Sequence, residues 1–198
     1  MGRRSSHTPE ELRQLILDAS RNIVESGGLL DFSAREIAKK IDYSAGTLYN
    51  VFRDLDDVLL TLQKQLLDDA ASCLADVPRT GTPAHRLDAL ARAYVRFALD
   101  NKRLWNLLFQ HQPPGEGVSG TLHDGVNAII VTVTEALAAL LPNAKAGEAD
   151  RAARVLWAGV HGITAIAVTE KSPTMTPETA EAYVESLTAT YIKGLAGA

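Results

Sequence analysis

The segment from Phe32 to Leu60 constrains the fold more than any other part of the chain, because its pattern predicts two short amphipathic helices joined by a brief turn. Ser33 precedes a helix whose third residue is Glu36, and this Ser-x-x-Glu spacing predicts a reciprocal capping box. Asp42 follows that helix, and aspartate tolerates the left-handed conformation that a turn needs. The segment therefore predicts a helix-turn-helix unit, which places its second helix in a groove of DNA.

The second predicted helix begins after Ser44 and turns Leu48 and Phe52 inward on one side. Its outer side carries no charge and combines small residues with a hydroxyl, a phenol and an amide, which are groups that base edges and phosphates can bind. We therefore expect the groove-facing residues to be Ala45, Gly46, Thr47, Tyr49 and Asn50. The alternative is an ordinary helix with a solvent-exposed face.

The sequence GTLYNVF at Gly46 to Phe52, preceded by REIAKKIDYS, resembles the DNA-binding domain of the tetracycline-repressor (TetR) family. The resemblance covers about the first quarter of the chain. It implies that Arg35, on the first short helix, reaches a base or a phosphate. The residues that we expect to contact DNA are Arg35, Ser44, Ala45, Gly46, Thr47, Tyr49, Asn50 and Arg53.

The chain departs from the family pattern at three positions, which are Asp42 where Gly is usual, Val51 where His is frequent and Leu55 where a phosphate-binding Lys is frequent. Arg53 could replace the missing lysine. The acidic DLDD stretch at 54–57 lies beside it and would repel a phosphate if it faced one.

The charge and composition of the chain narrow the class of protein. A net charge of −4 argues against indiscriminate coating of nucleic acid but allows a specific binder with local positive charge. The single cysteine, Cys73, excludes an internal disulfide. No segment has the roughly 20 uncharged apolar residues of a membrane span, and the first residues do not resemble a signal peptide. We therefore expect a cytoplasmic protein with no membrane partner.

Helical periodicity extends through the rest of the chain, and no segment shows the alternation typical of a strand. The predicted helices begin at Thr8, near Asp54, at Thr82, near Leu104, at Thr121, at Glu148 and at Thr176. Gln112 to Gly120 is predicted to be a flexible break. We expect an all-α fold, with a three-helix helix-turn-helix DNA-binding domain at residues 1–53 and a helical ligand-sensing and dimerisation domain at residues 54–198.

Two glycines, Gly159 and Gly162, lie inside the predicted helix that begins at Glu148. Each costs roughly 1 kcal/mol relative to alanine, and the close approach of another helix is the usual compensation. The pattern formed by Trp157, His161 and Gly162 is similar to the Trp-x-x-x-His-Gly signature of the WHG class of TetR-family C-terminal domains. That resemblance implies that the last two long helices form a four-helix interface with their copies in a second subunit.

A ligand pocket is predicted in this second domain, which holds both tryptophans. The residues expected to line it are Tyr94, Phe97, Trp105, Phe109, His123, Trp157 and His161. Aromatic residues at helical spacing are more often core residues, so each of these has a purely structural alternative. Because few charges fall on the inward faces, we expect the effector to be a small and largely apolar molecule.

The chain contains no metal-ligand cluster, phosphate-binding glycine loop or nucleophile elbow, so we expect no catalytic residues, no bound metal and no cofactor. The favoured function is a ligand-responsive transcriptional regulator, in particular a repressor that binds a palindromic double-stranded DNA operator as a homodimer and is released by a small molecule. Two alternatives remain: a DNA-binding dimer that senses nothing, and a helical enzyme that kept a vestigial DNA-binding domain.

Overall fold

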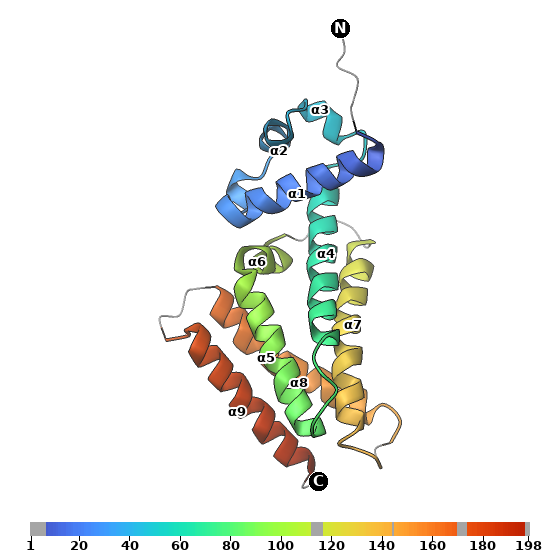
Figure 1. The fold of residues 1–198 in the computed structure, drawn as a ribbon, viewed down its shortest axis with the longest axis vertical. Coiled ribbons are helices and arrows are strands. Elements are labelled where there is room, and N and C mark those ends of the chain that lie inside the picture. The colour runs from blue at the N-terminus through green and yellow to red at the C-terminus, as the bar shows by residue number, and fades with distance from the viewer. Residues whose placement is uncertain (1–6, 112–116, 144, 170–173, 197–198) are drawn as a thin grey trace.

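The computed structural model describes residues 7–111, 117–143, 145–169 and 174–196. Within these ranges all regular structure is helical, so the predicted all-α class is confirmed (Figure 1). The elements are α1 (Pro9–Gly27), η1 (Leu29–Asp31), α2 (Ala34–Ile41), α3 (Ala45–Leu48), α4 (Leu55–Ala75), α5 (Pro83–Asp100), α6 (Lys102–Gln110), α7 (Gly117–Ala138), α8 (Glu148–Val168) and α9 (Pro177–Ala196).

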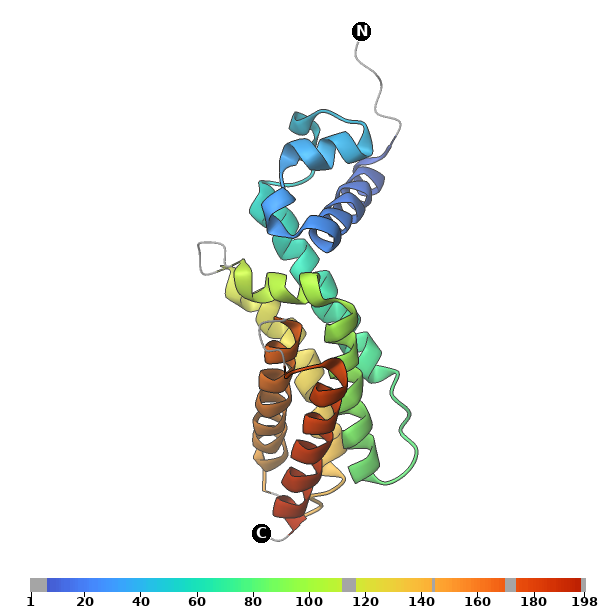
Figure 2. The same ribbon diagram turned by 90° about the vertical axis from the view of Figure 1, so that its left-hand side faces the viewer.

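The molecule has a small lobe of α1 to α3 and a larger lobe of α5 to α9, and α4 runs from one into the other (Figures 1 and 2). α4 packs on α1 in the small lobe and on α7 in the large lobe. Because this single helix contacts both lobes, the division into residues 1–53 and 54–198 stays a prediction.

Several helix starts follow directly from local sequence signals. Thr8 forms the complete predicted capping box with Glu11. The side chains of Asp54 and Thr82 accept backbone N–H bonds at the starts of α4 and α5. The box at Ser33 is only half formed, because Ser33 accepts from the Glu36 amide while the Glu36 carboxylate lies 3.8 Å from Nζ of Lys39.

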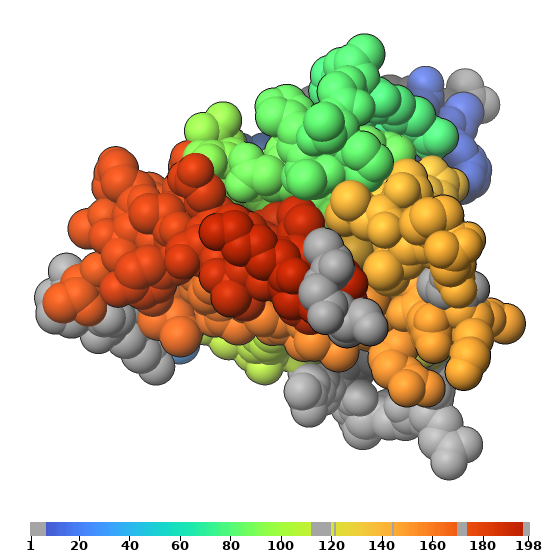
Figure 3. All heavy atoms as spheres, turned by 90° about the horizontal axis from the view of Figure 1, so that it is seen from below, coloured from blue at the N-terminus to red at the C-terminus, as the bar shows by residue number. Residues whose placement is uncertain are grey.

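The core of the larger lobe is built around α5, which contacts α4, α7, α8 and α9. Figure 3, the view from below, shows the end of this lobe covered by α9 and by the connections that precede α5 and α8. The predicted break at 112–120 is wrong in its second half, because α7 already begins at Gly117. Its first half, residues 112–116, lies outside the described residues. No helix in the described part of the chain is long and apolar enough to cross a bilayer.

The predicted close helix approach is found at Gly159 but not at Gly162. A Cβ on Gly159 would lie 2.8 Å from Cδ2 of Leu187, so α9 of the same chain packs against this position. A Cβ on Gly162 would meet no described atom within 4 Å. Of these two glycines, only Gly162 is therefore open to a partner from outside the chain.

A third glycine, Gly125, has the same kind of role in α7. A Cβ there would lie 2.7 Å from Cβ of Leu67 on α4. The missing side chain lets α7 lie directly against α4, and the sequence analysis did not identify this contact. Since Gly125 and Leu67 are far apart in sequence, only a pairing of α4 with α7 would have revealed it.

Candidate DNA-binding surface and ligand pocket

The turn of the helix-turn-helix unit has the predicted geometry. Asp42 ends α2 in the left-handed conformation, with φ 58° and ψ 44°. Leu48 and Phe52 are buried, as predicted. The helix α3 is shorter than expected, because after Leu48 the amides of Asn50 and Val51 bond three residues back, in the tighter 3₁₀ pattern.

The predicted DNA-contacting residues lie together at the free end of the small lobe, on α2, α3 and the turn that follows (Figure 1). All are exposed except Thr47, which is half-buried and whose hydroxyl lies 2.9 Å from that of Ser44. Tyr49 is 53% exposed although it is a large aromatic residue. An exposed phenol next to small residues suits contact with a groove.

The guanidinium of Arg53 is held by a neighbouring carboxylate. Its Nε donates to Oδ2 of Asp54 at 3.0 Å. Asp54 also accepts the Asp57 amide at 2.8 Å, and the Asp57 bond, followed by the Arg53 bond, lowers the pKa of Asp54. A phosphate would have to compete with this ion pair, which weakens the expectation that Arg53 takes the place of the lysine frequent in the family that the sequence resembles.

Arg13 is a positioning residue that the sequence analysis missed. From α1, its guanidinium donates to the Val51 carbonyl at 3.0 Å and to the Thr61 hydroxyl at 3.3 Å. The same group lies 4.1 Å from the ring centroid of Phe52. These contacts hold the segment after α3 against α1, and no local pattern could have indicated partners so far along the chain.

An aromatic cluster forms in the larger lobe around two residues from α5 and α8. The Tyr94 hydroxyl lies 2.7 Å from Nδ1 of His161. Trp157 stacks on His161 with ring centroids 4.9 Å apart, and Trp105 meets Tyr94 edge-on at 5.3 Å. Burial lowers the pKa of His161 and raises the pKa of Tyr94, so both rings are neutral near pH 7.

Six of the seven residues expected to line a pocket join this cluster, since Phe97 meets Trp105 at 6.1 Å and Phe109 meets His161 at 5.4 Å. His123 does not belong to it. That residue is exposed on α7, and none of the ring contacts found among the described residues involves it. Helical spacing alone does not determine whether His123 faces the cluster or the solvent.

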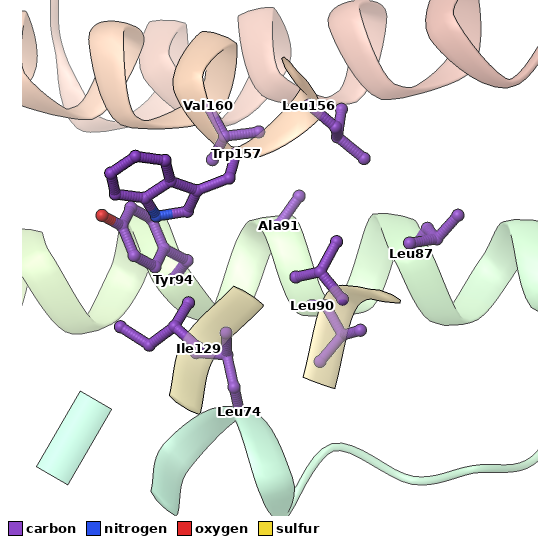
Figure 4. A pocket seen from close by; sticks show the side chains of 10 residues that line it. Leu74, Leu87, Leu90, Ala91, Tyr94, Ile129, Leu156, Trp157 and Val160 are labelled. Atoms are coloured by element: carbon purple, nitrogen blue, oxygen red, sulfur yellow. The ribbon is translucent and has the colours of Figure 1, made fainter. Parts of the chain in front are cut away.

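A small apolar cavity of about 20 Å³ adjoins the cluster. Tyr94 and Trp157 lie together at one end of it, while Leu87 and Leu156 lie at the other (Figure 4). A volume of about 10–15 Å³ holds one water, whereas sites for drug-sized ligands measure about 300–1,000 Å³. The conformation described is therefore closed, and a ligand larger than a few atoms must move side chains or helices apart.

The short helix α6 contacts both the aromatic cluster and the small lobe. It carries Trp105 and Phe109, and Figures 1 and 2 show it lying next to α1. At its start, Arg103 donates to the carbonyls of Glu25 and Ser26 at the end of α1.

Two residues of α4 hold the other end of α6. The fully buried Gln63 donates to the carbonyls of Leu107 and His111 at 2.9 and 3.1 Å. His111 Nε2 lies 2.9 Å from Oδ1 of Asp56. Hydrogen bonds thus join α6 and its C-terminal end to both α1 and α4. A shift of α6 would change these contacts with both helices.

Both α8 and α9 expose large apolar side chains. Val155 and Ile166 of α8 and Tyr183 of α9 are each about half exposed. Between Val155 and Ile166, the same side of α8 presents Ala158 and Gly162, at the three- and four-residue spacing of a packing stripe. Small residues at such spacing permit close contact with another helix.

The described part of the chain offers little for metal chemistry. No group of three or more His, Cys, Asp or Glu side chains there could hold a metal ion.

Comparisons with known proteins agree with this geometry. Residues 87–191 match the family described as "Tetracyclin repressor-like, C-terminal domain", and residues 16–62 match the family described as "Bacterial regulatory proteins, tetR family". No curated relative matches the chain. Since neither description names the WHG class, that resemblance stays a prediction.

Solved structures of similar fold cover nearly the whole chain. A protein of unknown function from Rhodococcus sp. RHA1 is 27% identical with a TM-score of 0.73, covering 98% of this chain and 100% of that one. A transcriptional regulator from the same organism is 22% identical with a TM-score of 0.69, covering 92% and 96%. FadR from Bacillus subtilis, a transcriptional regulator solved in complex with stearoyl-CoA, is 13% identical with a TM-score of 0.73, covering 91% and 98%.

Proposed function

The chain belongs to the TetR family of transcriptional regulators, and from this premise we propose that it is a repressor that binds a palindromic operator as a homodimer and releases it when a small apolar molecule enters the larger lobe. The observation that carries the proposal is the position of α6. This helix contacts the aromatic cluster through Trp105 and Phe109, and it contacts α1 and α4 through Arg103 and Gln63. A ligand that displaces α6 would therefore move the small lobe.

Contact with DNA is proposed for the exposed surface of α2 and α3. Arg35 and Tyr49 are exposed there, and both have long side chains. The other proposed contacts are Ser44, Ala45, Gly46, Thr47, Asn50 and Arg53. One recognition helix reads only a few base pairs, so two copies related by a two-fold axis are needed for a specific site, and such an operator is a near-palindrome.

The dimer interface is proposed to be the apolar face of α8 and α9. The half-exposed Val155, Ile166 and Tyr183 lie on it, and Gly162 is open to a close neighbour. Burial of such a surface against its copy supplies the hydrophobic driving force for association.

The ligand is proposed to enter beside Tyr94 and Trp157, where the wall is almost entirely apolar. The stearoyl-CoA complex of FadR supports the apolar character of the ligand, because FadR has a similar fold and stearoyl-CoA carries a long apolar chain. A ligand that weakens operator binding tenfold must prefer the DNA-incompetent conformation by about 1.4 kcal/mol, which is a modest difference in contacts.

The small volume of the cavity favours a second candidate function, a DNA-binding dimer that senses nothing. One experiment separates the two. Genomic fragments bound by the purified protein are selected, and the strongest is titrated with a metabolite panel while tryptophan fluorescence and operator binding are followed on the same sample. Both tryptophans lie in the aromatic cluster, so occupancy changes their emission. A compound that changes fluorescence and releases DNA supports the repressor.

The variant Gln63→Met tests the route through α6, with Gln65→Met on the same helix as the matched control. Removing the two bonds to α6 should leave the affinity for the compound within about twofold of the parent while operator release weakens markedly. Full release by Gln63→Met would contradict the route. Failure to select any DNA fragment, or ligand binding with unchanged operator affinity in the parent protein, would contradict the proposed function.

A further inference from the structure

Two indole N–H groups in the aromatic cluster have no acceptor among the described residues. Nε1 of Trp105 and Nε1 of Trp157 are both buried without a hydrogen-bond partner in that part of the chain, and Trp105 as a whole is only 1% exposed. The Trp157 N–H approaches Tyr94 and acts to lower the pKa of that phenol, against the larger effect of burial, but it completes no hydrogen bond with it. Buried donors are paired in most proteins, so an unpaired one beside a cavity indicates a ligand atom that can accept.

The Tyr94 and His161 pair adds a further donor. Burial lowers the pKa of His161, so the imidazole is neutral and the two side chains carry one O–H and one N–H between them. Only one of these hydrogens lies in the 2.7 Å contact between the Tyr94 oxygen and Nδ1. Whichever tautomer is present, the pair retains a second hydrogen that it can donate. The polar groups that line this end of the cavity, together with His161 behind them, are therefore rich in donors.

The wall of the cavity carries no charge to match a charged ligand. The described residues that line it are aliphatic, apart from Tyr94 and Trp157. A carboxylate or an ammonium group would lose its hydration there without gaining an ion pair, and that loss is large. Water is also held poorly, because a buried water needs two to four polar partners and the rest of this wall is apolar.

We propose that the effector is an uncharged, mainly hydrocarbon molecule with a carbonyl-type acceptor oxygen, which receives the Trp157 N–H while its hydrocarbon part lies between α5, α7 and α8. This class includes ketones, esters and lactones and excludes free carboxylic acids at neutral pH. The assignment rests on the proposed function, since it concerns the effector of the same site, but the two can be tested apart.

The test uses the full-length protein labelled with ¹⁵N-tryptophan, which gives two indole N–H signals because the chain has two tryptophans. Trp157→Phe assigns the signals. The protein is titrated with three probes of one chain length: 2-octanone, octanoate and octane. We expect 2-octanone to bind more tightly than octanoate and to move the Trp157 indole proton downfield, as a new hydrogen bond does.

The same probes are then applied to two variants. Trp157→Phe keeps an aromatic ring but removes the donor, so it should lower the affinity for 2-octanone about fivefold to tenfold and leave the affinity for octane unchanged within about twofold. Trp105→Phe, which removes the donor one ring further from the cavity, is the control and should have the smaller effect. The indole shift in the parent protein decides the question if either variant fails to fold.

Three results would overturn the ligand class: octanoate binding as tightly as 2-octanone, Trp157→Phe weakening octane as much as 2-octanone, or neither indole signal moving with any probe up to its solubility limit. Operator release is measured separately on the same samples. If 2-octanone binds as expected but the operator stays bound, the proposed function fails while the ligand class stands. If octanoate releases the operator, the function stands and the ligand class fails.

Discussion

The Tyr94 hydroxyl and Nδ1 of His161 lie 2.7 Å apart and join α5 to α8 inside the larger lobe. Burial lowers the pKa of His161, so the unfolded chain binds a proton there more readily than the folded chain. The associated stability is complete above the unfolded pKa of about 6.5 and is lost as the pH falls through the lower pKa of the folded protein. Protonation of His161 at low pH therefore lowers the free energy of unfolding.

The first prediction concerns the loss of stability as the pH falls. Between about pH 7.5 and 5.5, the midpoint of urea unfolding should fall more steeply for the parent protein than for His161→Asn. His123→Asn, which changes an exposed histidine on α7, should keep the parent profile. Parallel profiles for the parent and His161→Asn would show that the buried imidazole does not contribute to the acid sensitivity.

The second prediction concerns the contact of α7 with α4. Gly125→Ala would place a Cβ 2.7 Å from Cβ of Leu67, which cannot rotate away, so the helices must separate. We expect a loss of about 1–3 kcal/mol in the free energy of unfolding. Gly120→Ala, on the same helix with no described atom within 4 Å, should instead gain about 0.5–1 kcal/mol. Denaturant unfolding of both variants distinguishes packing from helix propensity, and equal effects would refute the close approach.

The third prediction concerns the dimer. Gly162→Leu adds a side chain on the open side of α8, so it should leave the fold of each subunit intact but raise the dimer dissociation constant at least about tenfold. Sedimentation over a concentration series measures this constant. Ala128→Leu, at an exposed site on α7, serves as the control. A parent protein that is monomeric at micromolar concentration would remove the basis for this interface.

The fourth prediction compares the contributions of two arginines to operator binding. Arg35 is exposed on α2, while the Arg53 guanidinium is already bound to Asp54 at 3.0 Å. Arg35→Ala should weaken operator binding by about 1–3 kcal/mol, and Arg53→Ala should have a smaller effect. Tyr49→Ala should match Arg35→Ala in size. Fluorescence anisotropy with a labelled operator measures all three, and a larger loss for Arg53→Ala would reverse the assignment.

The elements that could be predicted from sequence are those with local causes. Thr8, Asp54 and Thr82 each cap a helix by accepting the amide of the residue three positions later, so the capping residue and its partner lie close together in the sequence. The left-handed turn at Asp42 has the same local origin. These signals placed the helix-turn-helix unit correctly without knowledge of the rest of the fold.

The features that escaped prediction depend on which helices meet. Gly125 against Leu67, Arg13 against Val51 and Arg103 against the end of α1 are pairs from distant parts of the sequence. Helical spacing grouped the aromatic residues correctly in most cases, but His123 faces solvent because α7 presents that side outward. Periodicity gives the faces of a helix, while the choice of the inner face depends on the neighbours.

The continuity of α4 sets a length scale for any signal between the lobes. The helix has 21 residues, and at about 1.5 Å per residue it is about 30 Å long. A rigid rod of that length that tilts by about 6° displaces its far end by about 3 Å, close to the spacing of about 3.4 Å between successive nucleotides of one DNA strand. If the proposed ligand beside Trp157 tilted α4 by this amount, each recognition helix of the proposed dimer would be displaced from its half-site by about one nucleotide.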